Sequence, residues 1–107
     1  IHVEDLAKAH VMSLDYMAQG GKSQVLNCGY GRGFTVREVI DVVKELSGVD
    51  FAVEETGRRA GDPAALMADN QRITETLGWK PDYDDLGTIV QTALDWEKKW
   101  LRLKKEH

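Results

Sequence analysis

The chain has 107 residues, and its 42% hydrophobic and 30% charged residues are typical of one small globular domain. The net charge of −4 without a basic stripe argues against nucleic acid as a partner, and no apolar run approaches the roughly 20 residues that cross a membrane. A single cysteine, Cys28, excludes a disulfide framework, and three scattered histidines lack the paired carboxylates of a metal site. We therefore expect a cytoplasmic protein that binds no metal, no nucleic acid and no membrane.

The N-terminal part of the sequence predicts a helix followed by a short strand. Apolar residues recur at steps of three and four over residues 3–18, and Gly20-Gly21 ends this pattern. Gln24–Cys28 then have the composition of a strand. Because the first residue is Ile1, in apolar sequence, and not a methionine, we expect a piece of a longer protein.

The middle of the sequence predicts a second helix and a second strand. Thr35 precedes an apolar-periodic stretch and Glu38 follows three residues later, which is the spacing of a capping box. Gly48 ends this helix, and Phe51–Glu54 form the second strand candidate. The buried stripe of the helix is expected at its apolar positions Val36, Val39, Ile40, Val43 and Leu46.

The C-terminal part predicts a short helix and then a long one. Asp69 or Asn70 caps the short helix, and Gly78 closes it. Asp84 or Asp85 caps the long helix, whose apolar face is wide enough to contact more than one neighbour. We expect the large apolar area of the three tryptophans to lie in the core, at Trp79, Trp96 and Trp100.

The predicted order is helix, strand, helix, strand, short helix and long helix, an α/β chain that is mainly helical with a few short strands. Strands need partners, so we expect the chain to complete a sheet or layer that other residues supply. The basic run over residues 98–105 is interpreted as a solvated helix end that complements the helix dipole.

Two patterns give weak signals of chemistry. Gly29-x-Gly31-x-Gly33 lies where a dinucleotide-binding loop would lie, but the G-x-G-x-x-G spacing needs a glycine at position 34, which is Phe34, so plain turn chemistry is favoured. Arg32, at the tip of this loop, is interpreted as solvated and within reach of an anion.

The histidines give a second weak signal. His2 and Asp5 could be a catalytic base with its orienting carboxylate, but no nucleophile accompanies them. Asp5 is therefore interpreted as a dipole or capping partner of the helix, and His10, on the predicted apolar face, as a core histidine.

The strongest functional signal is the loop Arg58-Arg59-Ala60-Gly61-Asp62. A guanidinium offers a rigid fork of donors that suits phosphate oxygens, and a carboxylate can accept hydrogen bonds from a sugar hydroxyl. One short loop could thus hold a diphosphate and a ribose together, as a nucleotide-sugar site requires. The same charges could instead form a surface ion pair.

Taken in order, the motifs resemble the C-terminal part of UDP-glucose 4-epimerases, in the extended short-chain dehydrogenase/reductase superfamily. The segments that carry the resemblance are Ile1–His10, Val25–Gly33, Thr35–Val39, Arg58–Ala64, Ala68-Asp69 and Leu77–Trp79. The resemblance implies that residues 1–107 form the C-terminal substrate-binding lobe of an enzyme with an N-terminal NAD-binding Rossmann domain, and that this N-terminal domain is absent from the chain.

The resemblance also implies roles for three residues. Arg59 would bind the diphosphate of a UDP-sugar and Asp62 the uridine ribose. Leu66 falls where side-chain size influences whether N-acetylated sugars fit, and its moderate bulk favours plain UDP-glucose and UDP-galactose.

The catalytic apparatus of that family has no counterpart in this sequence. The NAD loop and the catalytic Tyr-x-x-x-Lys pair are missing: the residues four positions after Tyr16, Tyr30 and Tyr83 are Gly, Phe and Gly. We therefore expect no catalytic residue here and no cofactor bound by this part alone, NAD being held by the N-terminal domain. The isolated chain should be inactive and bind UDP weakly.

Two alternatives remain open at the level of sequence. The chain could belong to another NAD-dependent nucleotide-sugar epimerase, dehydratase or decarboxylase. It could also be a stand-alone interaction module. In either case exposed apolar faces would favour a homodimer or other self-association.

Overall fold

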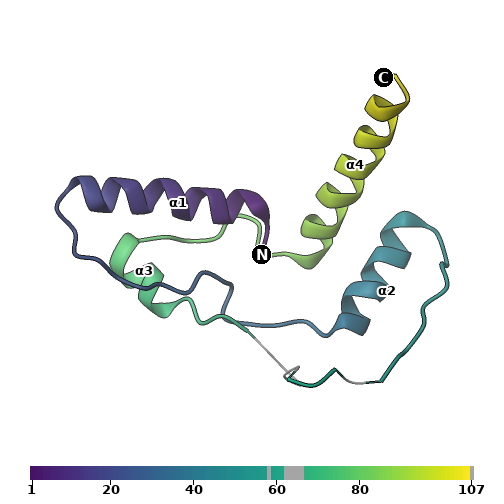
Figure 1. The fold of residues 1–107 in the computed structure, drawn as a ribbon, viewed down its shortest axis with the longest axis horizontal. Coiled ribbons are helices and arrows are strands. Elements are labelled where there is room, and N and C mark those ends of the chain that lie inside the picture. The colour runs from purple at the N-terminus through teal and green to yellow at the C-terminus, as the bar shows by residue number, and fades with distance from the viewer. Residues whose placement is uncertain (58, 62–66, 107) are drawn as a thin grey trace. The chain divides into compact units, whose positions relative to one another are not determined.

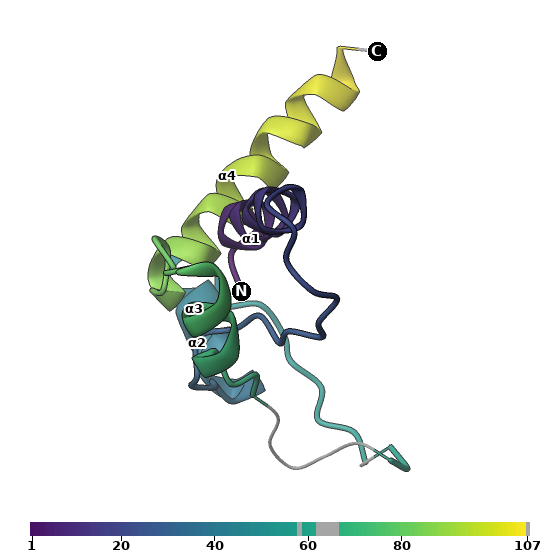
Figure 2. The same ribbon diagram turned by 90° about the vertical axis from the view of Figure 1, so that its left-hand side faces the viewer.

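The structure is a computed structural model that describes residues 1–57, 59–61 and 67–106. Four helices lie in this part of the chain, shown in Figure 1 and from a second side in Figure 2. They are α1 (Val3–Ala18), α2 (Val36–Ser47), α3 (Gln71–Leu77) and α4 (Leu86–Lys105). The chain divides into two compact units, each of which consists of two stretches of sequence.

The first unit comprises Ile1–Gly33 and Ala65–Asp84, so it contains α1 and α3. Its core consists of Ala9 from α1, Ile73 from α3 and Trp79, which follows α3 and is wholly buried. Partly buried apolar side chains complete this core: Met12, Leu26, Cys28, Tyr30 and Leu77. Burial raises the pKa of the Cys28 thiol, as expected for a small apolar residue.

The second unit comprises Phe34–Ala64 and Asp85–His107, and in it α2 packs against α4. The predicted capping box is confirmed, because the Thr35 and Glu38 side chains each accept the other's backbone N–H at 3.1 Å. Gly48 ends α2 with a φ of 68°, where glycine is favoured. The Asp85 carboxylate caps α4 by accepting the Thr88 amide at 3.0 Å.

The buried stripe predicted for α2 is only partly correct. Val39, Ile40 and Val43 are half-buried, but Val36 and Leu46 at the two ends of the helix are exposed. Val90 of α4 is the buried apolar residue of this unit among those described. A two-helix layer covers only the centre of each apolar face, which accounts for the exposed ends.

The two predicted strands are not confirmed. Residues 24–28 and 51–54 belong to neither a helix nor a strand, and the described part of the chain contains no strand. Val25 illustrates the reason, since its side chain is 83% exposed and no neighbouring extended segment is paired with it by a ladder of backbone bonds. A segment with strand composition forms a strand only when a partner supplies those bonds.

The prediction that the tryptophans lie in the core is correct for Trp79 and wrong for Trp96 and Trp100. Trp79 lies in the core, whereas Trp96 and Trp100 are 54% and 49% exposed and stack on each other with ring centroids 6.5 Å apart. Apolar side chains of α1 are likewise exposed, at Val3, Val11, Leu14 and Met17. The exposed apolar surface expected from the sequence is therefore present. Within the described residues, no helix combines the length and apolar character needed to cross a membrane.

Candidate functional site

The predicted nucleotide-binding loop follows the extended segment that runs beside α2. Of its candidate residues, the structure describes Arg59, which is exposed, while Arg58, Asp62 and Leu66 lie outside the described residues. A turn follows Arg59 at once, and Gly61 in that turn has a φ of 84°. Because side chains rarely adopt this backbone conformation, position 61 needs glycine. The turn thus falls between Arg59 and Asp62, the two residues predicted to hold the two halves of a nucleotide.

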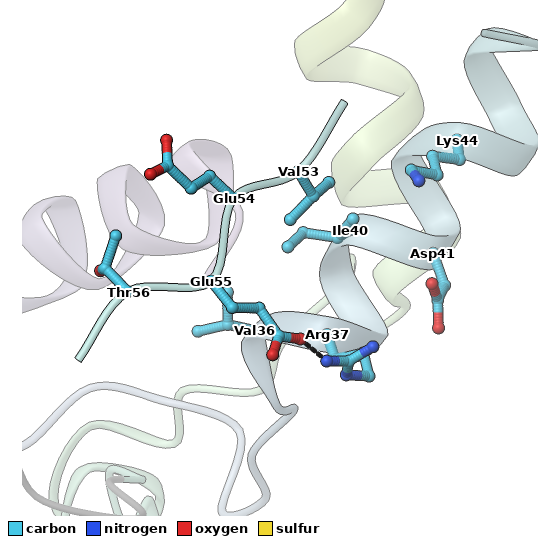
Figure 3. A pocket seen from close by; sticks show the side chains of 9 residues that line it. All are labelled: Val36, Arg37, Ile40, Asp41, Lys44, Val53, Glu54, Glu55 and Thr56. Atoms are coloured by element: carbon cyan, nitrogen blue, oxygen red, sulfur yellow. Dashed lines mark ion pairs between the residues drawn. The ribbon is translucent and has the colours of Figure 1, made fainter. Parts of the chain in front are cut away.

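An open groove of about 770 Å³ lies between α2 and the segment that leads into this loop (Figure 3). Its apolar side chains are Val36, Ile40 and Val53. Charged side chains surround them on the rim, and Arg37 forms an ion pair with Glu55 across it. The remaining residues that line the groove are Asp41, Lys44, Glu54 and Thr56. The rim therefore carries both signs of charge and favours neither anions nor cations.

The most elaborate polar cluster among the described residues lies in the first unit, around the wholly buried Asp5. Its carboxylate accepts the Tyr30 hydroxyl at 2.6 Å and the backbone amides of Asp82 and Tyr83 at 2.8 and 3.0 Å. Its backbone carbonyl accepts the Trp79 indole N–H at 3.0 Å. These bonds join the first turn of α1 to two distant segments, so Asp5 does more than the dipole or capping role that its position in the first turn predicts.

The electrostatics of this cluster keep Asp5 charged and Tyr30 neutral. Burial alone would raise the pKa of Asp5, but the hydrogen bonds from Tyr30, Asp82 and Tyr83 outweigh it and hold this pKa below its usual value. Burial, reinforced by the hydrogen bond to Asp5, raises the pKa of Tyr30 to about 12. A catalytic tyrosine base needs the opposite shift, so Tyr30 is a structural donor.

The histidines of α1 also differ from their predicted roles. The His2 ring caps the helix by accepting the Glu4 amide at 3.1 Å, and it stacks on Tyr83 with centroids 4.4 Å apart. His10 is exposed and its Nδ1 lies 2.8 Å from the Leu6 carbonyl, so it is not a core histidine. The Leu6 carbonyl, one turn earlier in α1, is thus the hydrogen-bond partner of the His10 ring.

The glycine-rich loop after residue 28 packs against the segment before α3. The Gly31 amide donates to the Ala68 carbonyl at 3.1 Å, and a Cβ added at Gly29 would lie 2.5 Å from the Ala68 Cβ. The close approach that Gly29 permits is therefore made by Ala68, another part of the same chain. This agrees with the turn chemistry predicted from the spacing of the glycines.

Arg32, at the tip of the same loop, is bound to the protein and not simply solvated. Its guanidinium donates to the Asp84 carboxylate at 2.8 and 3.1 Å and to the Asp84 carbonyl at 2.8 Å. Asp84 is the last residue of the first unit, so these contacts hold the end of that unit to the glycine-rich loop. The prediction of a solvated Arg32 within reach of an anion is therefore partly correct: its side chain is 52% exposed, and the anion that it reaches is a carboxylate 52 positions away in the sequence.

Sequence patterns missed the Asp5 cluster for a physical reason. His2, Asp5 and Tyr30 were each visible as polar or aromatic residues, but the tyrosine and the two backbone amides come from segments far from α1. The one local signal was a carboxylate in the first turn of a helix, and that pattern is equally typical of a simple dipole partner.

Comparisons with known proteins agree with each other in sequence and in fold. The chain is 50% identical over 98 residues to the UDP-glucose 4-epimerase of Azospirillum brasilense and 46% identical over 99 residues to that of Rhizobium leguminosarum bv. trifolii. Each match covers 92% of this chain. No protein-family model matches the chain.

Solved structures give the same result. The UDP-Glc/GlcNAc 4-epimerase of Campylobacter jejuni is 50% identical with a TM-score of 0.81, over 92% of this chain and 30% of that one. A UDP-glucose 4-epimerase crystal structure gives 44% identity and a TM-score of 0.87 over the same shares. The epimerase of Brucella ovis, solved in complex with NAD, gives 42% and 0.78, over 84% of this chain and 28% of that one. The chain spans about 30% of the length of the relatives that it matches.

Proposed function

We propose that this chain, which is homologous to a segment of the UDP-glucose 4-epimerases, forms the nucleotide-sugar-binding part of such an enzyme. The observation that carries the proposal is the agreement of sequence and fold, with 50% identity to one epimerase and a TM-score of 0.87 to another. The parent enzyme would interconvert UDP-glucose and UDP-galactose. The identities to 4-epimerases favour this reaction over that of other nucleotide-sugar enzymes.

Arg59 is the residue of the described loop that we assign to the substrate. Its side chain is exposed, and a guanidinium can hold two phosphate oxygens at once. A turn at residues 60–61 follows Arg59 directly, and Asp62 is the next residue in the sequence. We assign the diphosphate to Arg59 and the uridine ribose to Asp62.

The cofactor of the parent enzyme would be NAD, with which the Brucella ovis relative was solved. The glycine-rich loop of this chain offers little support for an NAD site, because Ala68 packs against Gly29 and its carbonyl already accepts the Gly31 amide. We therefore place NAD on the part of the enzyme outside the matched segment. NAD would carry the hydride, and this chain would hold the nucleotide so that the sugar is positioned for that step.

The choice of sugar is a narrower proposal. Leu66 would limit the space beside the sugar, so that plain UDP-hexoses are preferred over N-acetylated ones. The Campylobacter jejuni relative, which is 50% identical to this chain, is described as a UDP-Glc/GlcNAc 4-epimerase. Its name thus includes an N-acetylated sugar of the kind that Leu66 would disfavour. Ready turnover of UDP-N-acetylglucosamine by an enzyme that carries this segment would contradict the preference.

The experiment that tests the function is a chimera. This chain replaces the homologous segment of the Azospirillum brasilense epimerase, and turnover of UDP-galactose is measured with NAD present. We expect an active chimera, and we expect Arg59→Ala to lower its kcat/KM about a hundredfold through the loss of a bidentate phosphate contact. Arg59→Lys should restore part of this loss because the charge remains.

A matched control separates the site from the scaffold. Arg72→Ala removes another exposed arginine, which makes only a 3.5 Å contact with the Val25 carbonyl, and should leave turnover unchanged. An active chimera in which Arg59→Ala behaves like Arg72→Ala would overturn the assignment of Arg59. For the 107-residue chain alone we expect no epimerase activity and weak UDP binding, so a dissociation constant below about 1 μM by calorimetry would contradict the proposal.

The cellular location and the oligomeric state of the enzyme are part of the same proposal. We propose that it works in the cytoplasm and that it self-associates as a homodimer. The exposed apolar side chains of α1 support a further packing partner, which could be a second copy or the remainder of the enzyme. Sedimentation of the active chimera, compared with the Azospirillum brasilense enzyme, distinguishes a dimer from a monomer.

A further inference from the structure

The C-terminal half of α4 extends beyond α2, the helix that packs against α4. At 1.5 Å per residue, the 20 residues of α4 span about 30 Å, whereas the 12 residues of α2 span about 18 Å. Within the second unit, both views show the C-terminal half of α4 continuing past α2 (Figures 1 and 2). We call residues 96–106 the α4 tip.

One side of the α4 tip is aromatic and apolar. Trp96 and Trp100 are about half exposed and stack on each other, and Leu103 follows at the spacing that continues the same helical face. Leu101, which is 56% exposed, lies outside this side, about 140° around the helix from Trp96. Tryptophans at half exposure are typical of surfaces at which one end of the ring meets apolar material and the other meets water.

The rest of the α4 tip is strongly cationic. It carries five basic residues, Lys98, Lys99, Arg102, Lys104 and Lys105, against two acidic ones, Glu97 and Glu106. The whole chain has a net charge of −4, so the charge of the tip is opposite to that of the molecule. Lys98 and Lys105 lie on the side of the helix away from Trp96, which makes the tip an amphipathic basic helix end.

We propose that the α4 tip docks on an anionic lipid surface, with Trp96 and Trp100 at the level of the headgroups and Lys99 and Lys104, which flank the aromatic side of the helix, against their negative charges. Aromatic residues partition to this interface, and clusters of four to eight basic residues on an amphipathic helix bind acidic lipids. A second copy fits less well, because two tips side by side would place like charges together.

This mode of binding differs from the one that the sequence argued against. The expectation of no membrane partner rested on the lack of a spanning run, whereas the α4 tip would lie on the surface. The interpretation of the basic run as a merely solvated helix end did not include the two exposed tryptophans, which the sequence placed in the core.

Vesicle binding by the 107-residue chain tests the proposal. We expect at least tenfold tighter binding to phosphatidylcholine vesicles that contain about 30% phosphatidylserine than to pure phosphatidylcholine, and loss of this difference near 0.5 M salt. Tryptophan emission should shift to shorter wavelength on binding. Since Trp79 is already wholly buried, that shift would come from Trp96 and Trp100.

Three variants complete the test. The double variant W96A/W100A and the charge reversal K99E/K104E should each weaken vesicle binding at least tenfold. The control K22E/K80E, which reverses two exposed lysines of the first unit, should not. Circular dichroism verifies that α4 remains helical in each. Equal binding to both kinds of vesicle, or unchanged binding in both tip variants, would overturn the proposal. So would binding to single-stranded RNA, or tryptophan-dependent self-association, without binding to vesicles.

Discussion

The indole N–H of Trp79 donates a hydrogen bond of 3.0 Å to the backbone carbonyl of Asp5, and both residues are wholly buried. The carboxylate of the same Asp5 accepts the amides of Asp82 and Tyr83. One residue thus fixes the segment after α3 to the first turn of α1 through its backbone and its side chain together. The integrity of the first unit should therefore be sensitive to this position.

Replacing Asp5 by asparagine should destabilise the first unit by about 2–4 kcal/mol. An asparagine amide offers one oxygen where the carboxylate offers two, and its NH2 group would face the N–H and O–H donors that Asp5 now accepts. Urea unfolding followed by Trp79 fluorescence, in a W96F/W100F background, measures the change. The matched control is Asp15→Asn, at an exposed position of the same helix, and an equal midpoint for the two variants would contradict the prediction.

The stability of the first unit should fall in acid because of Asp5. Its pKa is lowered in the folded protein, so its contribution is fully present above the unfolded value of about 4 and is lost as the pH falls through the lower folded value. The free energy of unfolding should therefore decrease below about pH 4. Asp5→Asn should remove part of this decrease, and identical acid profiles for the variant and the wild-type chain would argue against it.

Tyr30 should cause a corresponding loss of stability at alkaline pH. Its pKa is raised to about 12, above the unfolded value of about 10, so its contribution is fully present below pH 10 and is lost as the pH rises toward 12. Tyr30→Phe should be less stable at neutral pH, through loss of the 2.6 Å bond to Asp5, and should show a flatter alkaline profile. Tyr16→Phe, which removes a hydroxyl bonded to Gln24, is the control and should leave the alkaline slope in place.

Gly29 should not tolerate a side chain. A Cβ there would lie 2.5 Å from the Ala68 Cβ and 3.0 Å from its carbonyl oxygen, so backbone must move. We expect Gly29→Ala to cost about 1–3 kcal/mol in urea unfolding. Gly57→Ala, where nothing lies within 4 Å of the added carbon, should be close to neutral. A neutral Gly29→Ala would show that the loop and the Ala68 segment are not held together in solution.

Local signals in the sequence were enough to predict the helices. Thr35 with Glu38, Gly48, Gly78 and Asp85 each mark a helix end through bonds or dihedral angles confined to about one turn, and the structure has helix ends there. Such features depend on neighbours that the sequence itself places side by side. They are predictable because no tertiary contact is needed to form them.

Features that depend on a distant partner were not predictable. Asp5 and Arg32 find their partners 25 to 78 positions away, and no pattern within one element indicates them. Periodicity correctly predicted that Trp96 and Trp100 share an apolar face, but it could not say that α2 is too short to cover them. The strand candidates failed likewise, since a strand is defined by its neighbour.

The candidate site depends on a different kind of inference. Residue chemistry alone left Arg59 and Asp62 between a nucleotide site and a surface ion pair, and order along the chain suggested the first. The structure adds an exposed Arg59 and a glycine turn directly after it. The roles of Arg59, Asp62 and Leu66 stay predictions, and the chimera measures them.

The partners of Asp5 also determine when the first unit can form during synthesis. The bonds to Tyr30, Trp79, Asp82 and Tyr83 join positions 25, 74, 77 and 78 residues apart, so the core around α1 closes only after residue 83 has left the ribosome. All of α2 emerges before that point, and it belongs to the other unit. A nascent chain halted between residues 34 and 79 should therefore leave α1 accessible to proteases and chaperones. A chain halted far enough past residue 84 for residue 83 to have left the ribosome should protect α1.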